Sequence, residues 1–299
     1  MTIQLTPGTA SPPDGRDAAQ VVARTESRRP KQVLILLPAV ALLIVVFFYP
    51  LADIVRLSFT QPSVGFANYV ALFTDGVTVT VLTRTLWTSA LIALVTVLIA
   101  YPYTYAMTRV SPRARGLLTI LVLIPFWTSI MARNFAWYLI EQRDGVIDQF
   151  LSAFGIHGVV LLGTLPGVAI AMVQVMLPFA VLPLYTSLST IDTKLMDAAA
   201  SCGAPKGRAF LTVYLPLSRP GLLSAFSLVL ILSLGFYITP AILGSAQQSL
   251  VSQLIATRVT KLLDFGAGGA LGMVLLAITL IVLGLVALIG RPTKGGARG

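Results

Sequence analysis

Charged side chains are scarce in this sequence. They make up 11% of its 299 residues, whereas 56% of the residues are hydrophobic; soluble domains carry about 25% charged residues. This balance excludes a soluble globular protein and indicates an integral membrane protein. The formal net charge is +10, but the basic residues are scattered between apolar stretches and form no aromatic-basic patch. We therefore expect no nucleic-acid partner.

Cysteine and histidine occur once each, as Cys202 and His157. A single cysteine excludes an internal disulfide, and these two residues cannot supply the several nitrogen or sulfur ligands of a metal site. We expect Cys202 to be a small, reduced filler and His157 to be a solvated loop residue. The sequence also has no Gly-Lys dipeptide, which excludes the phosphate-binding loop G-x-x-x-x-G-K-[ST]. The chain should hold no metal, no cofactor and no ATP.

Six apolar stretches are long enough to cross a membrane, because a spanning helix needs about 20 mostly apolar residues. Lipid offers the backbone no hydrogen-bond partners, so each stretch should be helical. The first follows a polar tail, but it is too long for a signal peptide and no small-residue cleavage site follows it. The expected fold class is all-α, with six transmembrane helices near 33–51, 82–107, 117–139, 163–184, 222–243 and 270–289.

Lysine and arginine are unevenly divided between the two sides that six spans would create. The richer side should be cytoplasmic, which places both termini and the segment between the fourth and fifth spans in the cytoplasm. That side holds Arg16, Arg24, Arg28, Arg29, Lys31, Arg109, Arg113, Arg115, Lys194, Lys206, Arg208, Arg219, Arg291, Lys294 and Arg298. The other side holds Arg56, Arg84, Arg143, Arg258 and Lys261.

The segment between the fourth and fifth spans is a polar insert that contains DAAASCG at 197–203 and VYLP at 213–216. Asp192 can cap a short helix, Gly203 can end it, and Pro205 can open a second helix at its first position. Lys206 and Arg208 should keep this helix–turn–helix at an aqueous boundary. Its alanine face is small enough for another protein to approach closely, which suits a docking site.

The insert resembles the EAA loop of ABC-importer permeases, whose pattern runs Glu-Ala-Ala, three residues, Gly, nine residues, Ile, one residue, Leu-Pro. Two positions differ conservatively, with Asp197 in place of glutamate and Val213 in place of isoleucine. The alternative interpretation is an ordinary alanine-rich cytoplasmic helix hairpin. By resemblance, the ATPase-coupling residues are Asp197, Ala198, Ala199, Gly203, Val213, Leu215 and Pro216.

Further segments resemble permeases of the spermidine/putrescine importer type, at 48–51, 101–106, 124–133, 177–184, 215–221 and 240–244. The resemblance implies a type I importer permease (MetI-like) fold in the bacterial inner membrane and favours polyamine cargo. Relatives of this type also move ferric iron, sulfate, phosphonates or amino-acid derivatives, which remain alternative cargoes. We expect a permease domain at 32–291 with its coupling loop at 192–220, a disordered cytoplasmic tail at 1–31 and a cytoplasmic tail at 292–299.

The same resemblance implies a half-translocator. Its partners would be a paralogous second permease, a cytoplasmic ATPase dimer that grips the EAA loops, a substrate-binding protein at the outer face, and membrane lipid. Closure of the ATPase would then rock the membrane helices and switch access between the two sides. ATP hydrolysis would belong to the partner, so this chain is not expected to be an enzyme.

Polar residues inside the spans are candidates for the translocation path, because burying them in lipid is unfavourable unless they pair or face water. Two alternatives stay open. Arg133 could snorkel towards the outer interface or be neutralised by Glu141, and the tryptophans could belong to an aromatic belt. The candidates are Arg133, Asn134, Gln174 and Tyr237, accompanied by Trp127 and Trp137.

A secondary carrier or channel is the alternative function class. Carriers driven by protons or sodium ions usually bury acidic residues along their path. We expect none of the acidic residues of this chain to lie in the middle of a span. That expectation and the coupling loop both favour the importer permease.

Overall fold

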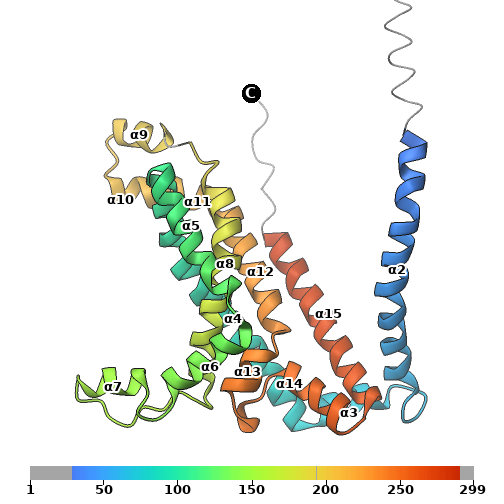
Figure 1. The fold of residues 1–299 in the computed structure, drawn as a ribbon. Coiled ribbons are helices and arrows are strands. Elements are labelled where there is room, and N and C mark those ends of the chain that lie inside the picture. Colours follow the sequence, from blue (N-terminus) through green and yellow to red (C-terminus); the bar gives the residue numbers. More distant parts are fainter. Residues whose placement is uncertain (1–28, 193, 290–299) are drawn as a thin grey trace, which may run out of the picture. The chain divides into compact units, whose positions relative to one another are not determined.

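The computed structural model describes residues 29–192 and 194–289, and the regular elements in these ranges are helices (Figure 1). The expected all-α fold class is confirmed. The tails expected at 1–31 and 292–299 fall mostly or wholly on residues 1–28 and 290–299, which lie outside the described residues. The chain divides into two compact units, Met1–Arg56 and Leu57–Gly299.

Helix α2, Arg29–Thr60, supplies the described part of the first unit and continues into the second. It extends beyond both ends of the expected span at 33–51, and its part suited to crossing a membrane is Val40–Thr60. An ion pair joins Arg56 Nη2 to Asp53 Oδ1 at 2.9 Å near its C-terminal end. Between Lys31 and Asp53 the helix carries no charged residue.

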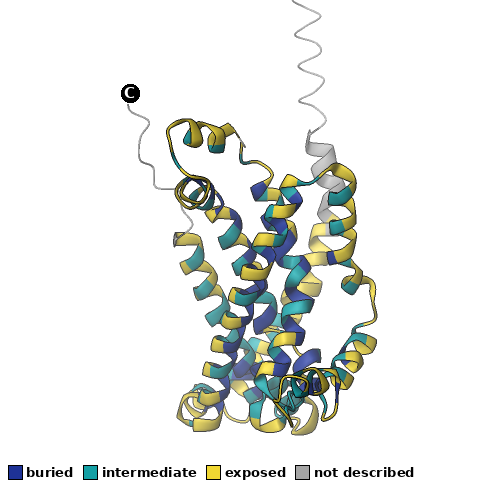
Figure 2. Cartoon of the chain, turned by 90° about the vertical axis from the view of Figure 1, so that its left-hand side faces the viewer, coloured by how far each residue is buried: buried dark blue, intermediate teal, exposed yellow. Residues whose placement is uncertain are grey.

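Three helices form the centre of the second unit: α4 (Gly76–Arg109), α8 (Leu165–Leu188) and α12 (Arg219–Leu234). They pack against one another, and their buried residues line the inner faces of the bundle (Figure 2). Small residues at such faces let helix backbones approach closely, which favours association where lipid removes the hydrophobic driving force. The fully buried alanines of these three helices are Ala93, Ala100, Ala171, Ala180 and Ala225.

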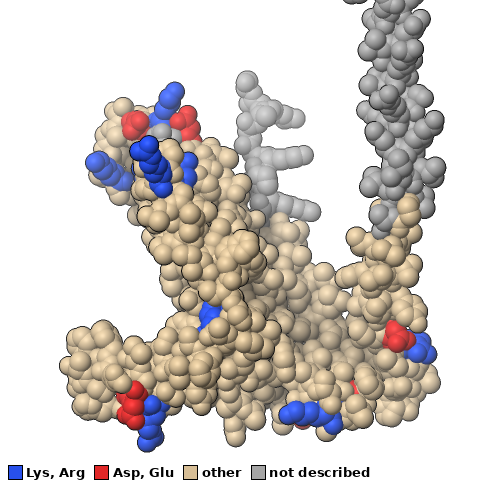
Figure 3. Space-filling view, in the orientation of Figure 1, with Lys and Arg blue, Asp and Glu red and all other residues tan. Residues whose placement is uncertain are grey.

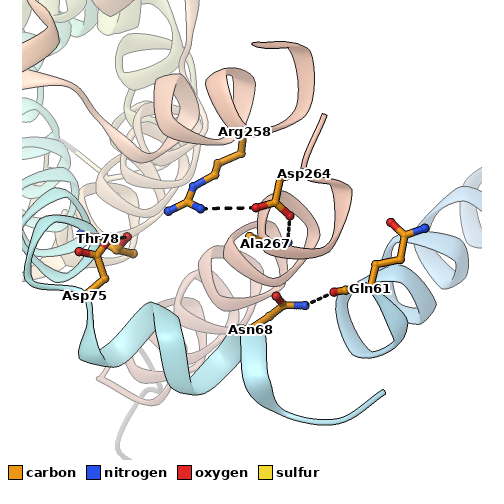
Figure 4. A network of polar contacts seen from close by, with 7 residues as sticks. All are labelled: Gln61, Asn68, Asp75, Thr78, Arg258, Asp264 and Ala267. Carbon is orange, nitrogen blue, oxygen red and sulfur yellow. Dashed lines mark hydrogen bonds and ion pairs between the residues drawn. The ribbon is translucent and has the colours of Figure 1, made fainter. Parts of the chain in front are cut away.

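A second, smaller core joins α15 (Phe265–Ile289) to α3 (Ala67–Thr74) and α14 (Val251–Ala256). Polar contacts hold the chain around it (Figure 4). Asn68 Nδ2 donates to the carbonyl oxygens of Ser58 and Gln61, at 2.8 and 2.6 Å. Arg258, in the π-helical turn η3 (Thr257–Lys261), pairs with Asp264 at 3.5 Å.

Two of the expected spans are interrupted, which corrects the sequence prediction. The stretch at 117–139 divides into α5 (Pro112–Trp127) and α6 (Ile130–Glu141), because the ψ angles of Thr128 and Ser129, 149° and 131°, are not helical. The stretch at 222–243 divides at Gly235 into α12 and α13 (Ile238–Leu243). A carbonyl freed at such a break needs a new partner.

By length and composition, four helices in the described part of the chain could each cross a membrane: α4, α8, α15 and the Val40–Thr60 part of α2. Two bent pairs raise the number to six if each pair is one span. One pair joins Pro112–Trp127 to Ile130–Ser152 with a bend of 93°, and the other joins Lys206–Leu217 to Arg219–Leu234 with a bend of 59°. The second pair includes part of the polar insert, which the sequence prediction had placed outside the spans.

The second unit has two distinct ends (Figure 1). The α9 end carries α9 (Lys194–Ser201) and α10 (Lys206–Ala209), next to the last turns of α4 and α8. The α14 end carries α14, α13 and α7 (Val146–Ser152), next to the first turn of α8. Lys and Arg side chains gather around α9 and α10 (Figure 3).

We expect Gly221→Val to destabilise the bundle by about 1–3 kcal/mol, the usual range for overpacking. A Cβ at Gly221 would lie 2.6 Å from Ser187 Cβ, so α12 and α8 would have to separate. Thermal unfolding of the purified protein measures the effect. Gly284→Val in α15 is the control, because nothing lies within 4 Å of a Cβ there; equal midpoints for the two variants would contradict the close approach.

Candidate functional site

The polar insert folds as a short helix, a turn and a second helix. Asp192 Oδ1 accepts a hydrogen bond from Lys194 N at 2.9 Å, which caps the start of α9 as expected. The chain leaves α9 through Gly203, whose φ of +82° is a left-handed conformation that glycine adopts without strain. One detail differs: Pro205 has an extended ψ of 151° and is the N-cap of α10 rather than its first helical residue.

Helix α9 presents a free surface at the α9 end of the second unit. None of its residues is buried within the chain. Asp197, Ala198 and Gly203 are exposed, and Ala199 is half-buried. A Cβ added at Gly203 would meet nothing within 4 Å. The small residues therefore leave a shallow surface that another protein can cover closely.

Cys202, expected to be a small filler, is an exposed free cysteine beside this surface. Lys206 and Arg208 are exposed, as predicted for an aqueous boundary, and so is the loop residue His157. The thiol therefore lies where a reagent or a partner protein can reach it.

An aromatic cluster fastens the second half of the insert to α4. Phe210 and Tyr214 lie at the two ends of a π-helical turn, η1 (Phe210–Tyr214), with ring centroids 5.7 Å apart. Tyr105 of α4 contacts both, with centroids at 5.5 Å from Phe210 and 5.1 Å from Tyr214. Tyr101 adds a contact with Phe210 at 6.2 Å. We call Tyr101, Tyr105, Phe210 and Tyr214 the aromatic joint.

The aromatic joint is a packed contact between the insert and α4, because Tyr214 is 2% exposed and its ring is enclosed by its neighbours. Edge-to-face aromatic pairs add about 0.5–1.5 kcal/mol each beyond the burial of their surface. The sequence prediction did not include this cluster. The i, i+4 spacing of Tyr101 with Tyr105 and of Phe210 with Tyr214 does indicate two aromatic pairs, each on one face of a helix. A displacement of α10 would be passed to α4 through these rings.

The remaining predicted coupling residues lie where the insert joins the helix bundle. Val213, Leu215 and Pro216 are half-buried, the last two in α11 (Leu215–Leu217). Ser218, which is 0% exposed, follows at the bend before α12; its Oγ lies 3.1 Å from Tyr101 Oη. The two halves of the predicted coupling loop therefore differ: 197–203 is exposed except at the half-buried Ala199, whereas 213–216 packs against the bundle.

The six predicted path residues do not converge on one site. Trp137 and Gln174 are brought together, with Trp137 Nε1 donating to Gln174 Oε1 at 2.7 Å. Asn134 is buried, and its Nδ2 donates to Ile130 O within its own helix. Trp127 is 83% exposed, whereas Tyr237 lines a cavity at the α14 end.

Arg133 does not pair with Glu141, which corrects one of the sequence alternatives. Eight residues of helix separate their backbones by about 12 Å, too far for a contact along one face. Arg133 Nη1 instead donates to the carbonyl oxygen of Pro125, which also accepts from Thr128 Oγ1 at 2.8 Å. These two donors satisfy a carbonyl at the break between α5 and α6. Arg133 therefore stabilises the bend.

Glu141, at the end of α6, is 1% exposed. Neither carboxylate oxygen has a hydrogen-bond partner among the described residues, and Oε2 lies 2.7 Å from the position of a Cβ at Gly167. The backbone carbonyl of Glu141 accepts from Leu161 and Leu162. The fold of the 161–167 segment over the end of α6 buries this side chain, which no local sequence signal reveals.

Two adjoining cavities hollow the α14 end, with volumes of about 490 and 580 Å³. Val77, Ala246 and Ser249 line both cavities, which therefore share part of their wall. Arg84 Nη1 fixes this loop to α4 by donating to the carbonyl oxygens of Gln247 and Ser249, at 2.8 and 3.3 Å. Sequence analysis placed Arg84 on this side but assigned it no contact.

Asp75 lines the larger of these cavities and is the N-cap of α4 (Figure 4). The hydroxyl of Thr78 donates to its carboxylate at 2.6 Å, and Val77 N donates at 3.1 Å. These hydrogen bonds lower the pKa of Asp75 below its ordinary value. The carboxylate therefore stays ionised at neutral pH and keeps the start of α4 in place.

A family model described as "Binding-protein-dependent transport system inner membrane component" matches residues 114–291. The matched range is more than half of the chain and contains α9, the second half of the insert and all six path candidates. The chain belongs to this family. Multi-pass insertion in a membrane follows, and the permease has the free α9 surface at one end and the two cavities at the other.

Named relatives agree with this family. The permease is 31% identical to the spermidine/putrescine transport system permease protein PotB of Haemophilus influenzae over 218 residues, which are 72% of this chain and 76% of that protein. It is 28% identical to PotB of Escherichia coli over 240 residues, 80% of this chain and 84% of that protein.

The permease also shares its fold with solved importers. A chain of a bacterial alginate ABC transporter, solved in complex with an alginate pentasaccharide-bound periplasmic protein, matches with a TM-score of 0.73. The match covers 91% of the permease and 99% of that chain, at 18% identity. At this identity the likeness establishes the importer-permease fold and no cargo.

Proposed function

We propose that this permease is the membrane-spanning subunit of an ATP-driven importer whose cargo is a polyamine such as spermidine or putrescine. The free α9 surface carries the proposal, because it offers small residues and a left-handed glycine to a partner at the end where Lys and Arg gather. Two relatives named for spermidine and putrescine transport support the cargo. Ferric iron, sulfate, phosphonate and amino-acid derivatives are the alternative cargoes.

The proposed partners follow from the two ends of the permease. An ATPase dimer would cover Asp197, Ala198, Ala199 and Gly203, and a substrate-binding protein would dock at the α14 end. A second permease would complete the path. The chain itself would carry out no covalent reaction. Closure of the ATPase would move α10, and the aromatic joint would pass that movement to α4 while α11 passes it to α12.

The proposed orientation places the α9 end in the cytoplasm, with the permease domain at 32–291 and both terminal tails on the same side. The distribution of basic residues supports this orientation. Arg109, Arg113, Arg115, Lys194, Lys206, Arg208 and Arg219 lie at the α9 end, whereas Arg84, Arg143, Arg258 and Lys261 lie towards the α14 end.

Labelling with an impermeant thiol reagent tests the orientation in a Cys202→Ser background. We expect Ser152→Cys, at the end of α7, to react in intact cells, and Ser111→Cys, at the N-cap of α5, to react only after the cells are opened. The background variant without a new cysteine measures nonspecific labelling. The reverse pattern would place the α9 end outside and remove the proposed ATPase contact.

Arg133→Gln tests whether this half-buried cation stabilises the bend or contacts an anionic cargo. Because Arg133 satisfies the Pro125 carbonyl, we expect the variant to lower the yield of folded protein while spermidine uptake per folded complex changes less than about twofold. Glutamine at 133 cannot reproduce the guanidinium fork. Uptake is measured in the reconstituted complex with spermidine and with sulfate. Selective loss of sulfate uptake would show that Arg133 contacts an anionic cargo.

Met131→Gln is the matched control for this experiment. Met131 lies on the same helix and is 58% exposed, so the substitution introduces the same side chain without removing a buried contact. It should leave yield and uptake close to those of the unchanged permease. Absence of spermidine uptake by the unchanged complex, with its own binding protein present, would remove polyamine as the cargo.

A further inference from the structure

A small cavity lies beside the aromatic joint, where the last turns of α4 and α8 meet the first turn of α5. Its volume is about 140 Å³. The polar wall is formed by Thr108, Arg109, Arg115, Tyr185, Ser189 and Tyr214, and an apolar edge is formed by Leu188 and Ile191. Two arginines therefore line one small space at the α9 end.

Aromatic rings hold both guanidinium groups in place. The Cζ atom of Arg109 lies 5.1 Å from the ring centroid of Tyr105 and 5.9 Å from that of Tyr214. The Cζ atom of Arg115 lies 5.8 Å from the ring centroid of Tyr185, and its Nε donates to Met107 O at 3.2 Å. A guanidinium held over a ring keeps its remaining N–H groups free to form hydrogen bonds.

No carboxylate of the described residues balances these two charges. Among residues 29–192 and 194–289, the ion pairs are Arg56 with Asp53 and Arg258 with Asp264, and neither contributes to this cavity. Two unbalanced arginines beside one cavity repel each other unless an anion lies between them. The hydroxyl of Tyr185 lines the same wall and can donate to that anion, whereas Thr108 Oγ1 and Ser189 Oγ donate to the carbonyl oxygens of Tyr105 and Thr186.

We propose that this cavity binds a phosphate group, with the headgroup of an anionic phospholipid as its source. Arginine forks match the oxygens of phosphate and form charge-assisted hydrogen bonds to them. The cavity lies where apolar helices end, and Leu188 and Ile191 continue its wall with an apolar edge. Basic pockets between membrane helices on the cytoplasmic side favour anionic headgroups. The proposal rests on the cytoplasmic placement of the α9 end.

Native mass spectrometry of the assembled transporter tests the site, with phosphatidylglycerol or phosphatidylcholine added in detergent. We expect the complex to retain phosphatidylglycerol preferentially, and Arg109→Gln and Arg115→Gln each to lower the retained fraction at least about tenfold. Arg113→Gln is the matched control, because it removes one charge from the same turn of α5 but does not line the cavity. It should retain the lipid.

A second arm adds inorganic phosphate without lipid and follows thermal unfolding of the same complexes. If inorganic phosphate stabilises the complex only when Arg109 and Arg115 are present, and no lipid is retained, the cavity is a phosphate site whose ligand is free phosphate. The proposal would be overturned if phosphatidylglycerol retention and stabilisation by inorganic phosphate were equal in all variants. Loss of the ATPase from both cavity variants without any change in lipid or phosphate binding would also overturn it, because the arginines would then be a protein contact.

The proposed orientation and the proposed phosphate site can be refuted independently of each other. If Ser111→Cys is labelled from outside while phosphatidylglycerol retention still depends on Arg109 and Arg115, the cavity binds phosphate but faces the other leaflet. If the labelling agrees with the cytoplasmic orientation and retention does not depend on the arginines, the orientation stands and the site is refuted.

Discussion

Gly203→Asp and Ala199→Glu should each abolish transport and release the ATPase from the complex. Either substitution places an unpaired carboxylate in a surface that a partner must cover closely. Leaving a charge buried and unpaired costs about 3–5 kcal/mol, which corresponds to a fall in affinity on the order of a hundredfold or more. Co-purification of the ATPase and uptake in proteoliposomes measure the two effects.

The chain offers a close control for Gly203→Asp. Gly155 has the same φ of +82° and, like Gly203, would have nothing within 4 Å of an added Cβ, but it follows α7 at the α14 end. Gly155→Asp therefore adds the same backbone strain and the same charge away from the docking surface. It should leave ATPase association unchanged. Equal loss of the ATPase from both glycine variants would show that strain, rather than docking, causes the defect.

Tyr214→Ala should uncouple the two ends of the permease. The side chain is 2% exposed and contacts Tyr105 and Phe210, so its removal opens the aromatic joint while α9 keeps its surface. We expect uptake to fall about tenfold or more, which equals roughly 1.4 kcal/mol in the rate-limiting barrier. ATPase co-purification should change less than about twofold, and basal ATP hydrolysis should continue.

Tyr214→Phe is the control, because it keeps the ring and both aromatic contacts. Loss of a large buried aromatic side chain also destabilises a protein by about 3–5 kcal/mol, so thermal midpoints are compared for all variants. Phe210→Ala, which removes a less buried member of the joint, provides a second test if Tyr214→Ala does not fold. Normal uptake in folded Tyr214→Ala or Phe210→Ala would remove the joint from the transmission path.

The features that sequence predicted correctly are local ones. Asp192 caps α9, and Gly203 takes a left-handed conformation, because both depend on residue chemistry within a few positions. The all-α fold class follows from composition and from the need of the backbone for hydrogen bonds in lipid. Long apolar stretches could therefore be located before their packing was known.

The features that sequence missed depend on tertiary contacts. The apolar stretches at 117–139 and 222–243 predict spans, but they do not show that α5 ends at Trp127 and α12 at Leu234. Arg133 contacts Pro125 only because that break exists. The burial of Glu141 requires the 161–167 segment to fold over α6, and the aromatic joint requires α4 and η1 to meet.

Crosslinking from the chain's single cysteine tests docking at α9 most directly. Cys202 is exposed and lies next to Gly203, so a short thiol-to-amine crosslinker can sample the partner at this surface without an engineered label. In membranes that contain the whole transporter, we predict an adduct with the combined mass of the permease and the ATPase, which Cys202→Ser abolishes. An unmodified ATPase, together with equal Cys202 labelling in the presence and absence of the ATPase, would contradict docking at α9.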